Sequence, residues 1–185
     1  IRVGVDVNFP PFTQAGIDAD NPVGFEIDLI NELAAKSGVA VKFINSDSNQ
    51  LLAFVSQCQL DVGISGITIS EPLKTSMEFT PSYYSTGQVV VVKEGNIVIT
   101  GKDDLTGMKV GTQDGTPSEL ELEKIPAVQI LDYGNFELAM EDLINGYLDA
   151  VVIDYPHALT YVNVDRNNLK IVGDEFGRAD YGIAV

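Results

Sequence analysis

The 185-residue chain contains no tryptophan, a single cysteine and a single histidine. Because Cys58 stands alone, an intrachain disulfide is excluded, and we expect Cys58 to pack as an inert thiol in a helical segment. Because His157 is the only histidine, no Ser-His-Asp or Cys-His arrangement has a second candidate, and we expect a surface or packing residue. Metal sites made of His and Cys clusters are excluded by the same counts. The sequence predicts no metal and no other cofactor.

Basic residues are also scarce, since 11 Lys and Arg stand against 27 Asp and Glu and give a formal net charge of −16. Such a surface repels phosphate backbones, which excludes nucleic acid as a partner. No apolar run approaches the roughly 18 residues of a membrane-spanning helix. The longest, residues 89–92, is typical of a buried strand. No secretion signal precedes the first strand, but a mature exported chain looks the same, so export stays open.

Strand and helix patterns alternate along the first half of the chain. The helical segment has apolar residues on one face and is followed by Gly38, a helix stop. The order β-α-β-α-β predicts a mainly parallel sheet covered by helices. The predicted segments are residues 1–7 (strand), 24–37 (helix), 39–44 (strand), 49–57 (helix) and 60–65 (strand).

The second half repeats this scheme, and residues 54–65 resemble residues 142–153 in detail. Two similar open α/β units fit this better than one long sheet, although similarity by chance stays open. We expect one lobe of residues 1–88 plus 181–185 and an inserted lobe of residues 89–180. Two crossing strands would form a hinge, and a ligand would bind beyond the carboxyl ends of the strands. The predicted segments are residues 108–112 (strand), 117–124 (helix), 128–131 (strand), 136–144 (helix) and 148–153 (strand).

Two candidate residues follow strands of the second lobe. Thr116 begins a capping box that ends at Glu119, and the free N–H groups of this helix start can hold a carboxylate. The alternative is simple capping. Asp154 follows the strand at residues 148–153 and can pair with an ammonium group. The alternative for Asp154 is an N-cap of the next helix.

The other candidates lie in the first lobe. Ser65, Gly66 and Thr68 end the equivalent strand, where hydroxyls and backbone amides can hydrogen-bond a ligand; the alternative is an ordinary turn. Phe9 follows the first strand and can stack on a ligand; the alternative is a core aromatic. Residues 18–21 fit a hairpin turn better than a calcium loop, because Pro and Val follow where a third ligand and a Gly are needed.

Taken in order, these segments resemble the family 3 periplasmic solute-binding proteins, the polar amino-acid receptors of ABC importers. The resemblance implies the type II periplasmic-binding-protein fold, in which two α/β lobes joined by two hinge strands close on a ligand. It also implies ligand contacts at the same six residues, with stacking by Phe9, a carboxylate held at Thr116 and an α-ammonium group held by Asp154. The matching segments are residues 1–6, 10–12, 23–29, 60–70, 77–80, 83–84, 107–111, 115–116, 148–154 and 181–185.

The sequence departs from the family pattern at several positions. Leu73 replaces the arginine that clamps the ligand carboxylate, and a bidentate guanidinium is the strongest anchor for that group. A second frequent aromatic of the family aligns near Ser48, which is small and polar, and Pro117 lacks an N–H where the family often offers one. Either Arg178 meets the carboxylate, or the ligand does not carry one. The family's largely helical C-terminal tail is also absent from this sequence.

The resemblance predicts a binding protein without enzymatic activity, capturing a small polar solute such as an amino acid. It would be exported to the periplasm or cell exterior, with or without a lipid anchor, act as a monomer and deliver its ligand to the membrane subunits of an ABC importer. Two alternatives use the same fold. One is the ligand-sensing extracellular domain of a signalling receptor, and the other is a periplasmic dehydratase.

Overall fold

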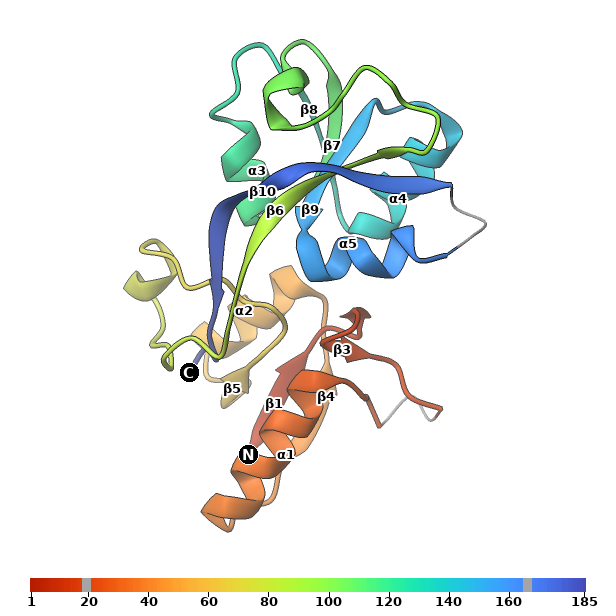
Figure 1. The fold of residues 1–185 in the computed structure, drawn as a ribbon. Helices are drawn as coiled ribbons and strands as arrows, with labels where there is room; N and C mark the ends of the chain where they lie inside the picture. The colour runs from red at the N-terminus through yellow and green to blue at the C-terminus, as the bar shows by residue number, and fades with distance from the viewer. Residues whose placement is uncertain (18–20, 165–167) are drawn as a thin grey trace. The chain divides into compact units, whose positions relative to one another are not determined.

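A computed structural model describes residues 1–17, 21–164 and 168–185. The chain divides into two compact units: unit 1 is Ile1–Ser85 with Asp180–Val185, and unit 2 is Thr86–Ala179. The chain leaves unit 1 within one long strand, β6, and returns within another, β10 (Figure 1). The hairpin turn predicted at residues 18–21 falls on residues outside the described part.

Unit 1 is built around a three-stranded parallel sheet in the order β4-β1-β5. The strand order of a β-α-β-α-β chain, with the first strand in the centre, confirms the parallel sheet predicted for this half. The elements are β1 (Arg2–Val5), β2 (Asn8–Phe9), β3 (Thr13–Gln14), α1 (Phe25–Ser37), β4 (Lys42–Asn45), α2 (Ser48–Ser56), β5 (Val62–Gly63) and the 3-10 helix η1 (Leu73–Thr75).

Each face of this sheet is covered by one helix, as the clusters of buried side chains show. On one face, Ile27 and Ile30 of α1 pack with Val3 and Val5 of β1. On the other face, Leu51 of α2 packs in a second buried cluster. The C-terminal residues of the chain also belong here, because Ala184 pairs with β5 as an antiparallel bridge. Unit 1 therefore has a core on both sides of β1.

The ends of α1 explain why the sequence pattern located this helix. Gly24 precedes the helix with φ 133°, and Gly38 follows it in the left-handed region with φ 68°. Both backbone conformations favour glycine, which has no Cβ to clash. The predicted helix is confirmed, with Gly24 as its N-cap instead of its first residue.

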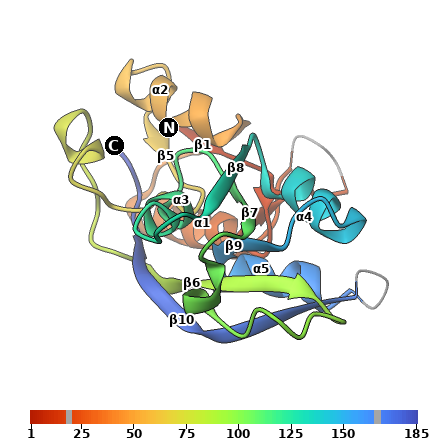
Figure 2. The ribbon, with the colours of Figure 1, turned by 90° about the horizontal axis from the view of Figure 1, so that it is seen from above.

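Unit 2 contains a five-stranded sheet in the order β10-β6-β9-β7-β8. Strands β7, β8 and β9 are parallel, whereas β6 runs antiparallel to β9. Figure 2 shows β6 and β10 running side by side. The elements are β6 (Tyr84–Lys93), η2 (Lys102–Leu105), β7 (Lys109–Gln113), α3 (Pro117–Leu122), β8 (Gln129–Tyr133), α4 (Phe136–Asn145), β9 (Ala150–Asp154), α5 (Tyr155–Val162) and β10 (Leu169–Tyr181).

The valines of β6 divide the core of unit 2 into two layers. Val89 and Val91 pack against the face that α4 and α5 cover, whereas Val90 and Val92 pack against Leu122 of α3. This alternation follows from the two-residue period of a strand. All four side chains are at most 1% exposed. The run of valines is therefore the buried strand that the sequence predicted.

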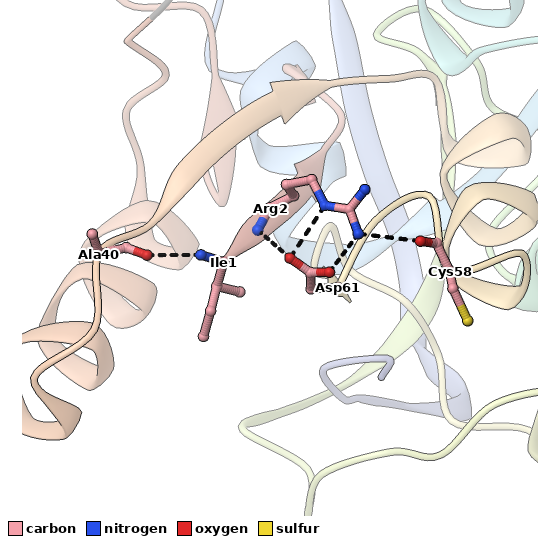
Figure 3. Close-up of polar contacts among 5 residues, drawn as sticks. All are labelled: Ile1, Arg2, Ala40, Cys58 and Asp61. Atoms are coloured by element: carbon pink, nitrogen blue, oxygen red, sulfur yellow. Dashed lines mark hydrogen bonds and ion pairs between the residues drawn. The ribbon is translucent and has the colours of Figure 1, made fainter.

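The start of β1 is fixed by polar contacts with the turn between α2 and β5 (Figure 3). The backbone N–H of Arg2 donates to Asp61 Oδ2 over 2.7 Å, and the guanidinium donates to Asp61 Oδ1 and to the Cys58 carbonyl. The amino group of Ile1 donates to the Ala40 carbonyl over 2.8 Å. The hydrogen bond from Arg2 holds the pKa of the Asp61 carboxyl down at about 2.

Cys58 and strand β10 differ from what the sequence predicts. Cys58 is exposed and lies beyond the end of α2, with a left-handed φ of 56°, so it is not a packed residue within a helix. Helix α2 ends at Ser56, two residues before Cys58. Strand β10 was also missed over most of its length, because Gly173, Gly177 and charged residues interrupt the alternation expected of a strand.

Candidate functional site

The candidate residues of unit 1 gather where β1 and β5 end. Ser65 is buried, and its hydroxyl donates to the Asp6 carbonyl and accepts from the Asp6 N–H, both over 3.2 Å. The Asp6 side chain accepts from the Ser48 hydroxyl over 2.7 Å and from the Ser48 N–H over 3.0 Å. Ser48 thus helps to hold the end of β1.

Phe9 and Gly66 are in direct contact. Gly66 has φ 59°, and a Cβ added to it would lie 2.3 Å from Phe9 Cε1, so only glycine lets the loop approach the ring. The Phe9 ring stacks on Phe12 with centroids 5.4 Å apart and meets Tyr181 edge-on at 5.9 Å. Phe9 is half-buried. It therefore belongs to the aromatic core of unit 1 and still keeps part of its surface exposed.

Glu26 holds the Gly66 loop through a hydrogen bond. The sequence patterns did not identify Glu26 as a candidate residue. Its carboxylate is fully buried and accepts hydrogen bonds from the Thr13 hydroxyl (2.7 Å), from the Gly66 N–H (2.8 Å) and from the Tyr83 hydroxyl. Burial raises the pKa of Glu26, against the hydrogen bonds from Tyr83, Thr13 and Gly66, which lower it. The signal in the sequence was a charged residue on the apolar stripe shared with Ile30.

Thr68 pairs with Tyr181 as an antiparallel bridge. Its Oγ1 is buried and has no hydrogen-bond partner within residues 1–17, 21–164 and 168–185. An unmade hydrogen bond of a buried hydroxyl costs about 1–3 kcal/mol. Thr68 therefore retains hydrogen-bonding capacity, whereas the Ser65 hydroxyl is already engaged with Asp6.

In unit 2, Asp154 ends β9 and is 7% exposed. Its Oδ1 accepts a hydrogen bond from Gln88 Nε2 over 2.5 Å. Asp154 is the N-cap residue of α5 by position, but its side chain makes no capping hydrogen bond to that helix. Of the two interpretations that the sequence left open for this side chain, capping of α5 is wrong.

Neither hydrogen bond of the capping box predicted at Thr116 is formed. Thr116 is the N-cap residue of α3, but its hydroxyl donates to the Gln113 carbonyl over 2.6 Å and does not cap the helix. Glu119 reaches back to the Gly115 N–H over 2.7 Å, one residue earlier than expected. The Thr116 hydroxyl therefore serves as a donor to the Gln113 carbonyl and not as an acceptor for the N–H groups at the start of α3. Ser118 is fully buried, and its hydroxyl donates to Gln88 Oε1.

Gln88 connects Asp154 of β9 with Ser118 of α3. The sequence patterns did not identify Gln88 as a candidate residue. It is fully buried on β6, with its Cα directly opposite that of Asp154 in the antiparallel pair β6–β9. Its amide donates to Asp154 at one end and accepts from Ser118 at the other. The signal in the sequence was a polar residue at the head of the apolar run at residues 89–92.

The remaining residues considered from the sequence lie as follows. His157 is 2% exposed and packs edge-on against Phe136, so it is a packing residue, and burial lowers its pKa to about 3. Leu73 begins η1, and Lys74 forms an exposed ion pair with Glu71 over 2.8 Å. Arg178 is exposed on β10.

Within the described residues, no group of three or more His, Cys, Asp or Glu side chains is arranged to hold a metal ion. Within the same residues, no helix combines the length and the apolar character needed to cross a membrane.

Comparisons with known proteins identify the family of the chain. The family model described as bacterial extracellular solute-binding proteins, family 3, matches residues 1–170. The L-cystine-binding protein TcyJ of Escherichia coli K12 is 32% identical over 187 residues, covering 100% of this chain and 70% of that protein. A putative ABC transporter arginine-binding protein 2 of the same strain is 30% identical over 192 residues, covering 100% and 77%.

Solved structures give the same result for the fold. An ancestral arginine-binding protein bound to glutamine has a TM-score of 0.91 and 40% identity, covering 100% of this chain and 82% of that chain. ArtJ of Geobacillus stearothermophilus, which binds arginine, lysine and histidine, has a TM-score of 0.92 and 31% identity, covering 100% and 80%. The predicted α/β fold of the periplasmic-binding-protein type is confirmed. The chain belongs to the family 3 bacterial extracellular solute-binding proteins.

Proposed function

We propose that this chain binds a small polar solute with an ammonium group, an amino acid or a close relative of one, and delivers it to the membrane subunits of an ABC importer. Family membership and the names of the relatives support the transport role. The observation that carries the ligand class is Asp154, a carboxylate at the carboxyl end of a parallel strand, which is where open α/β sheets bind ligands. A carboxylate there pairs with an ammonium group by charge-assisted hydrogen bonds.

The ligand contacts proposed in unit 1 are Phe9, Ser65, Gly66 and Thr68. The contact of the Phe9 ring with the Gly66 backbone supports this, as does the unused hydrogen-bonding capacity of the Thr68 hydroxyl. Ser65 contributes by its backbone, because its hydroxyl is engaged with Asp6. In unit 2 the proposed contacts are Asp154 and Thr116.

The ammonium group is the main anchor in this proposal. Leu73 offers no guanidinium, Pro117 offers no N–H, and the Thr116 hydroxyl donates to Gln113. Arginine and glutamine are the first ligands to test, because they were bound by ancestral proteins 39% and 40% identical to this chain. The net charge of −16 favours the encounter with a cationic amino acid such as arginine. Export with or without a lipid anchor, action as a monomer and closure of the lobes on the ligand stay predictions.

A thermal-shift panel tests the proposal. The panel contains L-arginine, L-glutamine, L-cystine, agmatine and the desamino counterpart of arginine. At a ligand concentration of about 100 Kd, binding stabilises the folded protein by about 2.7 kcal/mol, which corresponds to a rise in Tm of about 5 °C or more. We expect a rise in Tm only from ligands that carry an amino group at the position of the α-amino group of an amino acid. A shift from the desamino compound equal to that from arginine would contradict the proposal.

Asp149, just before β9, and Asp154, its last residue, provide a matched pair of variants. Asp154→Asn is expected to weaken arginine binding about 100-fold, because one partner of a desolvated charge pair is lost. Asp149→Asn is the control. Asp149 accepts from the Lys109 N–H over 2.8 Å at the other end of the strand, so its loss should leave affinity unchanged. Equal affinities of the two variants would remove Asp154 from the site.

A further inference from the structure

Gln88 is a fully buried amide whose two ends are both used. Its Nε2 donates to Asp154 Oδ1 over 2.5 Å, and its Oε1 accepts from the Ser118 hydroxyl. A serine hydroxyl can donate to the carbonyl end of an amide, and an ionised carboxylate can only accept. The two neighbours therefore define one orientation of the amide, because a flip would turn its oxygen toward the carboxylate.

The position of Gln88 in the sheet would suit an apolar side chain. Residues 88, 90 and 92 of β6 share one face, and Val90 and Val92 lie there in the buried cluster that includes Leu122 of α3. Burial of an amide is unfavourable unless its hydrogen bonds are made. Packing alone would thus favour another aliphatic residue at position 88, so the amide must serve its polar neighbours.

We propose that Gln88 is the positioning residue for ammonium recognition: it fixes one oxygen of the Asp154 carboxylate, and Ser118 of α3 fixes Gln88. The proposal rests on the proposed function, in which Asp154 binds the ammonium group. A neutral amide suits this role because it donates a hydrogen bond without adding a positive charge. The Gln88 contact thus orients the carboxylate and does not neutralise it.

The register of the sheet makes this positioning direct. The Cα atoms of Gln88 and Asp154 are opposite each other in the antiparallel pair β6–β9, so their side chains lie on the same face. Gln88 is also three residues beyond Ser85, the last residue of unit 1 in the first crossing. The orientation of Asp154 is therefore set by the strand through which the chain enters unit 2.

A double-mutant cycle between Gln88 and Asp154 tests the proposal, with L-arginine as the probe and calorimetry or NMR titration as the measurement. Gln88→Met keeps the length of the side chain and removes both hydrogen bonds. We expect it to weaken arginine binding about 10-fold in the otherwise unchanged protein and less than about 3-fold when combined with Asp154→Asn. This non-additivity is expected because Gln88 acts through Asp154.

Other outcomes separate the possible failures. Unchanged affinity of Gln88→Met, or the same loss in both backgrounds, would overturn the positioning role. Unchanged affinity of Asp154→Asn alone would instead overturn the proposed function on which it rests. Ser118→Ala provides a milder variant in case Gln88→Met does not fold. It frees only the carbonyl end of the amide and should weaken binding about 3-fold, again only while Asp154 is present; an equal loss in both backgrounds, or none, would count against the role.

Discussion

The corner between α2 and β5 in unit 1 and the corner between α4 and β9 in unit 2 are built from the same hydrogen bonds. A residue with left-handed backbone conformation follows each helix: Cys58 follows α2, and Gly146 follows α4. In both corners an aspartate lies three positions further on. The residue directly after the left-handed one, Gln59 or Tyr147, donates to the carbonyl five residues earlier, over 2.8 Å and 2.9 Å. This is the Schellman pattern of helix termination. The two halves of the chain thus repeat at the level of single backbone contacts.

The aspartates after these corners also act alike. Asp61 accepts from the N–H of Arg2 at the start of β1, and Asp149 accepts from the N–H of Lys109 at the start of β7. Unit 1 adds a guanidinium contact to Asp61, shown in Figure 3, with side chains that are 46% and 42% exposed. An exposed pair of this kind adds little stability. The shared element is therefore the backbone contact, and the ion pair is an addition.

The units differ in the carboxylate that each buries near its candidate contacts. Unit 1 holds Glu26 with hydroxyl and backbone donors, whereas unit 2 holds Asp154 with the amide of Gln88. Glu26 supports the Gly66 loop by accepting a hydrogen bond from the Gly66 N–H, whereas Asp154 lies at the end of β9. In our proposal, the common scaffold therefore carries two carboxylates with different roles: Glu26 stabilises the fold, and Asp154 binds the ligand.

The largest effect is expected from removal of the structural carboxylate. Glu26→Ala leaves the Gly66 N–H and the hydroxyls of Thr13 and Tyr83 without their acceptor, which should lower the free energy of unfolding by about 3 kcal/mol. Urea unfolding measures this value. A loss below about 1 kcal/mol would contradict a structural role and erase the difference between the two carboxylates.

The nearly isosteric Glu26→Gln variant tests the ionisation of the same group. Because the pKa of Glu26 is raised in the folded protein, its contribution to stability is full below the unfolded value of 4.5 and is lost as pH rises through the folded pKa. The stability of the unchanged protein relative to Glu26→Gln should therefore fall as pH rises from 4.5 through the raised folded pKa. A relative stability that rises with pH over this window would show that the hydrogen bonds outweigh burial.

The two corners should be equally tight. A Cβ added to Gly4 of β1 would lie 2.5 Å from Leu60 Cδ1, and one added to Gly111 of β7 would lie 2.5 Å from Leu148 Cδ1. Each Gly→Ala change should cost about 2 kcal/mol by overpacking, with local loss of hydrogen-exchange protection in its own unit. A large cost in one unit and none in the other would break the proposed equivalence.

The smallest effects concern the left-handed residues, and they should have opposite signs. Gly146→Ala places a Cβ at φ 82° and should destabilise the protein by about 1 kcal/mol. Cys58→Gly relieves the same strain at φ 56° and should stabilise it by about 0.5 kcal/mol, since the exposed thiol adds no packing. Thermal unfolding of both variants measures the pair. Destabilisation by Cys58→Gly would show that the thiol has a role in the corner.

Much of this fold could be predicted because periodicity and glycine stops agree in α1 and in the corner at Gly146. Strand β10 could not, since its charged residues and two glycines hide the alternation, and neighbouring strand β6 supplies the pairing instead. The capping box predicted at Thr116 does not form, because the choice of the Thr116 hydroxyl between the helix N–H groups and the Gln113 carbonyl depends on the turn geometry.

The positions of the candidate residues were harder to judge from the sequence than the elements. Glu26 and Gln88 were visible as polar residues in apolar patterns, but the partners that explain them are distant in the sequence. Gly66 is 40 residues from Glu26, and Asp154 is 66 residues from Gln88. Long-range contacts of this kind follow from sheet register and not from local pattern.

The most direct test of the central claim, that an ammonium group at Asp154 anchors the ligand, is calorimetric titration of the unaltered protein with two compounds. One is L-arginine, and the other is its desamino counterpart, which keeps the guanidinium and the carboxylate. The account predicts that arginine binds at least about 100-fold more tightly. Equal dissociation constants for the two compounds would contradict it.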